Sequence, residues 1–183
     1  MTPEVRTPVS VDEFWRLASR FPKAELVGGQ VIELVPPGVH HGVLALAMGR
    51  RLHEYVAEGG LGVVMVEAGF VLSRDPPTVR VPDVAVVLRE RVPSPLPAGF
   101  FPGAPDLAVE VLSPDERPTE IAAKVADYLR AGAQAVWVLD PEDRTMTVHT
   151  RQSAVTYSRT EVLRGAPPLP GLELRLQVVF TDI

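Results

Sequence analysis

Two apolar runs separated by a helical pattern limit the folds open to this chain more than any other feature. Leu107–Leu112 and Ala135–Leu139 are each long enough for a buried strand, and Thr119–Ala131 between them has helical spacing and stops at Gly132. A helix that joins two strands of one sheet forms a parallel, right-handed crossover in nearly all proteins. This unit predicts an α/β or α+β fold with a mixed β-sheet flanked by helices.

Further elements are expected on both sides of this unit. A capping box from Ser10 to Glu13 predicts a short helix over residues 10–20, and a helical pattern covers His41–Glu58. Strands are predicted in the hairpin Glu25–Val35 with its turn at Gly28-Gly29, in Gly62–Leu72, in Val81–Leu88, in the hairpin of Thr145–Thr150 and Ala154–Ser158, and in Leu172–Val179. Residues 73–80 and 89–105 contain prolines and are predicted to be loops, the second a surface loop or lid.

The bulk composition bounds the class of protein. A length of 183 residues predicts a single domain over residues 1–183. No apolar run reaches the ~18–20 residues of a membrane span, and the N-terminus lacks the pattern of a signal peptide. A cytoplasmic protein without a membrane partner is therefore expected. The absence of cysteine excludes disulfides, thiolate metal sites and a cysteine nucleophile.

Lysine and asparagine are unusually rare. The chain has two lysines, Lys23 and Lys124, against sixteen arginines, and it has no asparagine and nineteen prolines. This composition is typical of a thermophile, and a codon bias towards arginine, alanine, glycine and proline explains it equally well. The net charge of −5 disfavours a protein that coats nucleic acid without specificity.

Two acids stand in apolar strands, where a carboxylate is costly unless it is paired or bound to a metal. Glu110 lies in the middle of Leu107–Leu112, and Asp83 lies near the start of a neighbouring predicted strand. The chain runs about 10 Å from Glu110 to the strand end, and the following helix returns about 9 Å by Lys124. Such a group suits phosphodiester cleavage: Asp83 and Glu110 would hold Mg²⁺ or Mn²⁺, and Lys124 would position the attacking water.

Each of these residues also has a purely structural interpretation. Asp83 could cap a turn, and Glu110 could form an ion pair with Arg80. Lys124 could be an exposed helix residue paired with Glu120 one turn earlier. The residue pattern leaves these alternatives open.

Three further side chains are candidates for the same site: Glu25, Glu67 and His41. Glu25 begins a hairpin, and His41 lies next to a helix N-terminus, where backbone N–H groups favour phosphate. The structural alternatives are an edge-strand charge for Glu25, a solvent-facing strand position for Glu67, and a surface position for one of the adjacent His40 and His41. His53 lies too far along the helix to complete a zinc site.

Several segments share the pattern of one known family. They are Pro82-Asp83, Glu110 to Pro114, Lys124 and Tyr128 on the next helix, Ala135 to Pro141, the Glu25–Gly29 hairpin, His40-His41 and the tail Pro170–Leu174. Through them most of the chain resembles the Uma-type restriction endonuclease family of the PD-(D/E)XK nuclease superfamily. The resemblance implies a restriction-endonuclease-like core with an extra N-terminal hairpin and C-terminal strands.

The same resemblance implies a Mg²⁺-type site in which Asp83 and Glu110 match the two acids. The superfamily motif places a lysine at residue 112, and this chain has Leu112 there. The family pattern allows the lysine to stand on the following helix, which is the position of Lys124.

Three hypotheses of function follow. The first is a metal-dependent DNA endonuclease with Asp83, Glu110 and Lys124 as catalytic residues, in which segment 89–105 shapes access to DNA. The second is a non-catalytic nucleic-acid-binding or regulatory module that retains the fold, which Leu112 and the acidic charge favour. The third is hydrolysis of another phosphate ester by the same acids.

Cleavage of both DNA strands would favour a homodimer or a higher homo-oligomer. The apolar C-terminal strand, Leu172–Phe180, is a candidate interface. The alternative is that this strand completes the central sheet.

Overall fold

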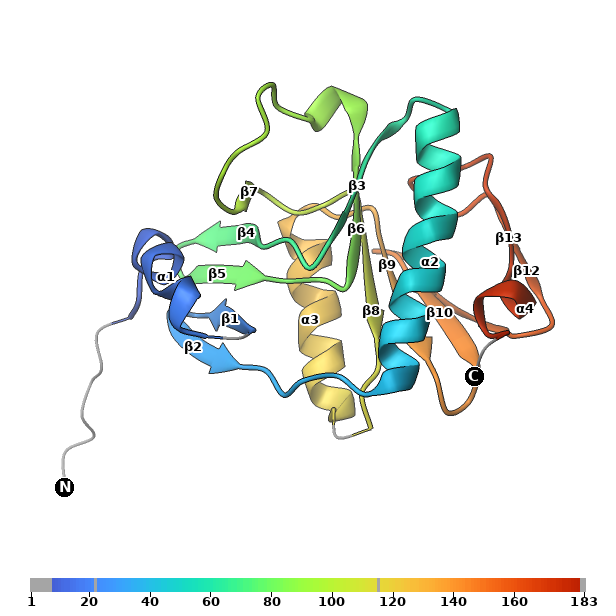
Figure 1. The fold of residues 1–183 in the computed structure, drawn as a ribbon, viewed down its shortest axis with the longest axis horizontal. Helices are drawn as coiled ribbons and strands as arrows, with labels where there is room; N and C mark the ends of the chain where they lie inside the picture. Colours follow the sequence, from blue (N-terminus) through green and yellow to red (C-terminus); the bar gives the residue numbers. More distant parts are fainter. Residues whose placement is uncertain (1–7, 22, 115, 182–183) are drawn as a thin grey trace.

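The computed structural model describes residues 8–21, 23–114 and 116–181. Figure 1 shows two β-sheets side by side, with the longer helices packed on the larger one. The predicted absence of a signal peptide concerns residues 1–7, which lie outside the described residues. Among the helices of the described ranges, none has the length and apolar character needed to cross a bilayer.

The larger sheet contains the predicted strand-helix-strand unit. Its strands are β3 (Gly62–Val66), β6 (Val84–Leu88), β8 (Leu107–Val111), β9 (Ala135–Asp140), β10 (Thr145–His149) and β11 (Ala154–Ser158). They lie in the order β11-β10-β9-β8-β6-β3. β8 and β9 are parallel, and the other neighbouring pairs are antiparallel. The prediction of a mixed sheet is thereby confirmed.

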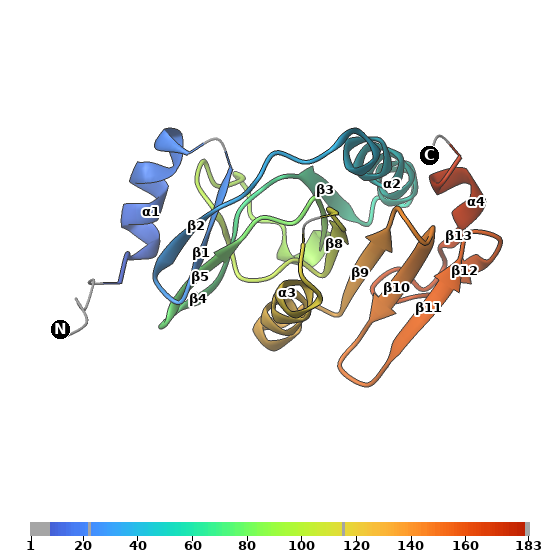
Figure 2. The ribbon, with the colours of Figure 1, turned by 90° about the horizontal axis from the view of Figure 1, so that it is seen from below.

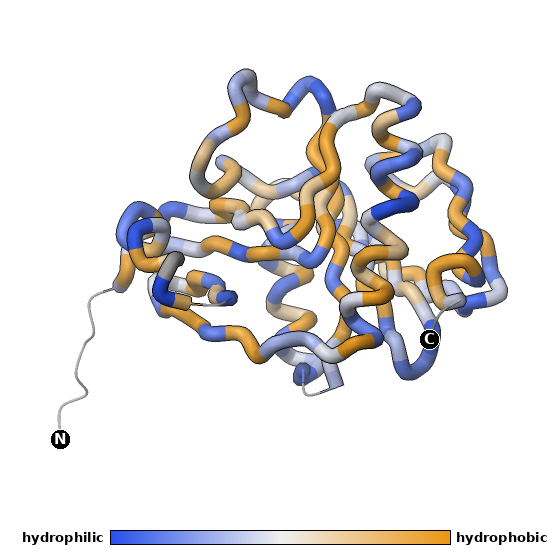
Figure 3. Tube along the Cα trace, viewed as in Figure 1, coloured by the Kyte–Doolittle hydropathy of each residue, from blue (hydrophilic) through white to orange (hydrophobic). Residues whose placement is uncertain are grey.

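Two helices cover opposite faces of this sheet, as Figure 2 shows. They are α2 (Val39–Glu58) and α3 (Pro118–Ala131). Alternation along β8 places Val109 on the α2 side of the core and Ala108 on the α3 side. The strands between the helices are apolar over most of their length (Figure 3), because both faces are covered.

The smaller sheet carries the N-terminal hairpin. Its strands are β1 (Ala24–Val27), β2 (Gln30–Glu33), β4 (Phe70–Arg74), β5 (Pro77–Arg80) and β7 (Phe101–Pro102), in the order β2-β1-β5-β4-β7. The predicted turn is confirmed: Gly28 and Gly29 have φ values of 57° and 81°, which glycine tolerates best. The capping box at Ser10 is also confirmed, and it begins α1 (Val11–Leu17).

The segment predicted as one strand over Gly62–Leu72 is two strands in different sheets. β3 belongs to the larger sheet and β4 to the smaller one. The chain leaves β3 through Glu67, whose φ of 50° lies outside the strand region. A single residue with a left-handed backbone thus redirects the chain, which an apolar pattern does not reveal.

Two segments predicted as loops contain strands. Residues 73–80 complete β4 and form β5, which pairs with both β1 and β4. Within 89–105, a 3₁₀ turn (Arg89–Arg91) and β7 form, and Phe101 and Ala104 are buried. The ring of Phe100 stacks on Phe14 of α1. Aromatic packing therefore fixes the end of this segment against the smaller sheet, whereas residues 94–99 form the exposed surface loop that the sequence predicts.

The C-terminal end differs from the predicted strand over Leu172–Val179. It forms a short β13 (Glu173–Arg175), paired with β12 (Val162–Arg164), and then a helical turn, α4 (Leu176–Val179). Most of its apolar side chains are buried in the core under α2, namely Leu172, Leu174, Leu176, Val179 and Phe180, whereas Val178 is 40% exposed. The predicted role of this segment as an interface is therefore not supported, and it does not join the larger sheet either.

Candidate active site

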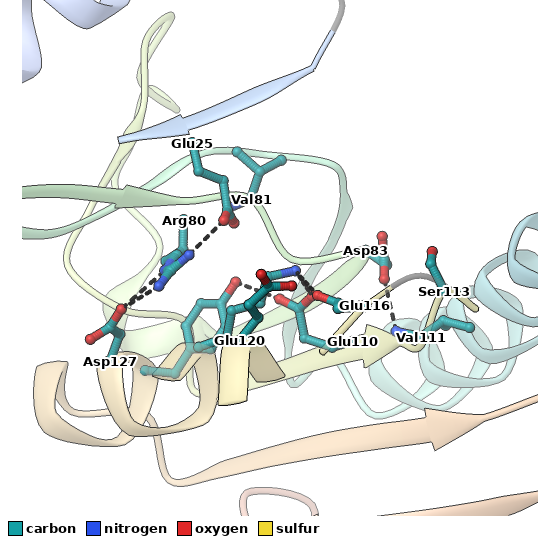
Figure 4. Close-up of polar contacts among 12 residues, drawn as sticks. Glu25, Arg80, Val81, Asp83, Glu110, Val111, Ser113, Glu116, Glu120 and Asp127 are labelled. Atoms are coloured by element: carbon teal, nitrogen blue, oxygen red, sulfur yellow. Dashed lines mark hydrogen bonds and ion pairs between the residues drawn. The ribbon is translucent and has the colours of Figure 1, made fainter. Parts of the chain in front are cut away.

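Sheet pairing brings the two strand-borne acids together. Asp83 directly precedes β6, and Glu110 lies in β8, which pairs with β6 with Val84 opposite Val109. Asp83 Oδ2 accepts a hydrogen bond of 2.8 Å from the Val111 N–H, and Figure 4 shows this contact beside Glu110. Asp83 is 5% exposed and Glu110 is 2% exposed.

Helix α3 supplies both partners of Glu110. The Lys124 ammonium donates to Glu110 Oε2 at 3.0 Å, and the Tyr128 hydroxyl donates to Glu110 Oε1 at 2.8 Å. Lys124 and Tyr128 stand one helical turn apart, so they share the face that packs on the sheet. The rise estimate that placed Lys124 level with Glu110 agrees with this geometry.

Lys124 is a largely buried residue. Its side chain is 12% exposed and its ammonium also contacts Glu116 Oε1 at 3.0 Å. Glu120 instead accepts a hydrogen bond from the Arg117 N–H at the start of α3. The alternative of an exposed lysine paired with Glu120 is therefore wrong.

Leu112 has the same strand parity as Glu110, so it packs on the α3 side of the sheet with apolar residues of that helix. A side chain at residue 112 is thus directed towards α3. Here the apolar Leu112 side chain occupies that space, and the ammonium group comes from α3 itself, through Lys124. The site keeps a lysine even though the motif position does not.

Asp83 has partners from two other parts of the chain. His41 Nε2 lies 3.0 Å from Asp83 Oδ1, and Lys23 Nζ lies 3.3 Å from the same oxygen. Lys23 also donates to Glu67 Oε1 at 3.0 Å. The two lysines of the chain therefore contact the two strand-borne acids, one lysine each.

Sequence reasoning missed Lys23. It stands in the short connection between α1 and β1, and no spacing relates it to Asp83, 60 residues later. Only the composition could have indicated a role for Lys23. The chain has two lysines among sixteen arginines, so Lys23 is as unusual as Lys124.

The accessory candidates occupy different places. His41 is 8% exposed and Ser113 Oγ lies 3.4 Å from its Nδ1, whereas His40 is exposed. Glu67 is exposed just after β3: its backbone N–H donates to the Asp83 carbonyl at 3.3 Å, and Lys23 lies between the two carboxylates. Glu67 therefore faces solvent and also belongs to the surroundings of the site, because its carboxylate contacts Lys23 and Lys23 contacts Asp83.

Glu25 belongs to a separate group of charges beside the acids. Its carboxylate accepts from Arg80 at 2.7 Å and from the Val81 N–H at 3.0 Å. Arg80 also donates to Asp127 Oδ2 on α3 at 2.6 Å (Figure 4). The alternative pairing of Arg80 with Glu110 is therefore wrong. We call Glu25, Arg80 and Asp127 the Arg80 cluster.

Burial and unbalanced charge perturb the acids. Burial, together with the nearby carboxylates of Asp83 and Glu25, raises the pKa of Glu110 to about 7, although Lys124 opposes the shift. Burial also acts to raise the pKa of Asp83, but hydrogen bonds from His41 and from the Val111 N–H, with the charge of Lys23, lower it. The two neighbouring acids are therefore driven towards different protonation states, as is common where acids do chemistry.

The acids face a cavity of about 520 Å³. Two lysines of the lining contact Asp83, Glu110 and Glu116, and Lys23 also contacts Glu67, which is 55% exposed and lies outside the lining. When all four carboxylates are ionised, their charge exceeds that of the two lysines by two, which is the charge of one divalent cation. Two carboxylates completed by water are a common way to hold Mg²⁺ in proteins, so the donor chemistry of Asp83 and Glu110 fits such an ion. In the described ranges, no group of three or more histidine, aspartate or glutamate side chains is placed to hold a metal on its own.

Comparison with solved structures identifies the fold. The chain is similar to a crystal structure described as a "putative nuclease belonging to DUF820 from Anabaena variabilis", with a TM-score of 0.81 and 22% sequence identity. The likeness covers 95% of this chain and 98% of that chain. The mixed-sheet α+β fold predicted from the sequence is thereby confirmed, because a likeness at this identity shows a shared fold.

The family follows from the sequence itself. The family model Uma2, described as "Putative restriction endonuclease", matches residues 11–178. The chain belongs to this family, and the resemblance inferred from its motifs is confirmed. A comparison with curated proteins gave no match.

Proposed function

We propose that this protein is a metal-dependent nuclease that hydrolyses phosphodiester bonds in DNA. One observation carries the proposal: two buried carboxylates, Asp83 and Glu110, lie side by side on the sheet, and Lys124 lies 3.0 Å from one of them at the wall of a cavity. Membership of the family described as a restriction endonuclease supports the reaction class.

Asp83 and Glu110 would hold Mg²⁺ or Mn²⁺. When bound, such an ion polarises the scissile phosphate and acidifies an attacking water. The excess negative charge of the site supports this assignment, because a divalent cation restores the balance that two lysines leave incomplete. Burial of the carboxylates limits their contact with water, so each interaction with a cation is strong.

Lys124 would position the attacking water and stabilise negative charge on the phosphate. Its ammonium is fixed by Glu110 and Glu116, so little reorganisation is needed during reaction. Lys23 and His41 act on Asp83 and hold its Oδ1 in place, with contacts of 3.3 and 3.0 Å. We assign both of them as positioning residues.

Purified protein incubated with DNA in Mg²⁺ or Mn²⁺ tests the proposal. Asp83→Asn and Glu110→Gln keep the size of each side chain and remove its charge, so each variant should fold and lose metal-dependent cleavage. Arg144→Gln is a matched control, because Arg144 lies outside the cavity lining. Cleavage that persists in both acid variants would refute the assignment.

A non-catalytic binding module is the second candidate function. The observation in its favour is that each acid already contacts an ammonium group without any metal. Such a module would show no rise in melting temperature with Mn²⁺, because nothing in it binds the ion. An Mn²⁺-dependent rise that is lost in Asp83→Asn would exclude it.

A further inference from the structure

The cavity that holds the acids has one apolar wall and one acidic wall. The apolar wall follows β2 and the connection to α2, and it includes Ile32, Leu34, Val35 and Pro37. Ile32 is 42% exposed and Val35 is 78% exposed, which is unusual for large aliphatic side chains gathered at the mouth of a site. Nothing in the proposed metal chemistry accounts for this apolar wall.

The charged lining is poorly suited to a nucleic-acid duplex. Six carboxylates and three fixed cations line the cavity: Glu25, Glu33, Asp83, Glu110, Glu116 and Glu120 against Lys23, Arg80 and Lys124. Within the described lining, each of the three cations already contacts a carboxylate of this chain. Duplex binding depends on many phosphate contacts from free lysine and arginine side chains. The described lining therefore offers no unpaired lysine or arginine for the many phosphates of a duplex.

The size and depth of the cavity also disfavour a duplex. A volume of about 520 Å³ falls in the range of small-molecule sites. The acids form its buried floor, so a phosphodiester must descend between the wall at β2 and the first turns of α3 to reach them. A stacked duplex is stiff, and enzymes that take a base into a recessed pocket act on single strands or on extruded nucleotides.

We propose that this site takes a single-stranded nucleic-acid segment, one nucleotide of which enters the cavity with its base on the apolar wall at Ile32 and Val35. The phosphodiester of that nucleotide then lies at Asp83 and Glu110. A base is uncharged and flat, so it suits the aliphatic wall, and only one phosphate meets the acidic floor. This inference rests on the proposed nuclease function and specifies the form of its substrate.

Cleavage of three matched substrates in Mn²⁺ tests the inference: a short single strand, the same strand in a full duplex, and the duplex with one unpaired bulged nucleotide. We expect kcat/KM for the single strand to exceed that for the duplex at least roughly tenfold. Cutting of the bulged duplex should occur at the bulge. Duplex cleavage at the single-strand rate would overturn the inference and leave the nuclease proposal standing. No cleavage of any substrate would overturn both.

A variant of the apolar wall gives a second, independent measurement. Ile32→Glu should raise KM for the single strand roughly tenfold with little change in kcat, because it places a charge where the base lies. Val155→Glu is the matched control: it makes a similar change on edge strand β11, at a residue 46% exposed and outside the cavity lining. Equal KM values for the two variants would contradict a base-binding wall.

Discussion

The Arg80 cluster and the acid pair of Asp83 and Glu110 lie next to one another, both buried, and they differ in charge balance. In the cluster, Glu25 and Asp127 contact two cations, Arg80 and the exposed Arg130. At the acid pair, two lysines contact four carboxylates. Because both groups bury charge, we propose that the unmatched charge, and not burial alone, marks the functional group.

The cluster also has a clear structural task. Arg80 connects β5 to α3 through Asp127, and Glu25 connects β1 to the same guanidinium. These contacts fix α3 against the smaller sheet, and α3 carries Lys124 and Tyr128 onto Glu110. The Arg80 cluster thus helps to hold the partners of Glu110 in place.

The largest expected effect is on stability at the cluster. Arg80→Met leaves Glu25 buried without its cation, so we expect the free energy of unfolding to fall by about 3–5 kcal/mol. Arg130→Met removes the other partner of Asp127, at a side chain 74% exposed, and should cost under about 1 kcal/mol. Urea denaturation of both variants measures the difference. Similar losses would show that the cluster is not a structural unit.

Lys124→Ala should act on catalysis instead. It removes the ammonium that we propose positions water at Glu110, so we expect kcat with Mn²⁺ to fall about 100-fold, or about 2.7 kcal/mol of barrier. Lys124→Arg should not restore the rate, because a planar guanidinium does not fit a compact ammonium site. Single-turnover cleavage measures both variants. A wild-type rate in Lys124→Ala would remove this lysine from the mechanism.

Lys23→Ala should have a smaller effect on the same reaction. Asp83 keeps its contacts with His41 and with the Val111 N–H, so the carboxylate stays in place. We expect a loss of about tenfold in kcat, which equals about 1.4 kcal/mol. Glu67→Gln, which changes only the outer partner of Lys23, is the control and should keep nearly the full rate. If the control loses as much as Lys23→Ala, the outer pair matters as much as the lysine.

The smallest effect is expected at Tyr128. Tyr128→Phe removes the hydroxyl that donates to Glu110 and keeps the buried ring, so the free energy of unfolding should fall by about 1 kcal/mol. Tyr157→Phe, on β11, is a matched control and should change stability by less. Thermal unfolding compares the two. An unchanged stability in Tyr128→Phe would show that the hydroxyl adds nothing to the fold.

Local signals predicted much of the fold and the contact between Lys124 and Glu110. The strand-helix-strand unit, the capping box at Ser10 and the Gly28-Gly29 turn depend on neighbours in sequence, so the sequence contains their cause. Lys124 could be placed beside Glu110 because strand and helix rises fix the distance travelled along one unit of chain.

The remaining features depend on contacts between distant segments. β5 is a strand because β1 and β4 lie on both sides of it, although a proline begins it. β3 and β4 separate because Glu67 adopts a left-handed backbone, and the residues next to it in sequence do not indicate this conformation. Lys23 lies in an irregular connection before β1, and it contacts Asp83 only because the fold brings these distant segments together.

Calorimetric titration with Mn²⁺ tests the central claim most directly, namely that the unmatched charge at Asp83 and Glu110 is a metal site. Wild-type protein and Asp127→Asn, which alters only the Arg80 cluster, should each bind one ion with similar affinity. Asp83→Asn and Glu110→Gln should lose that binding. A wild-type protein that binds no ion, or binding that survives in both acid variants, would contradict the account.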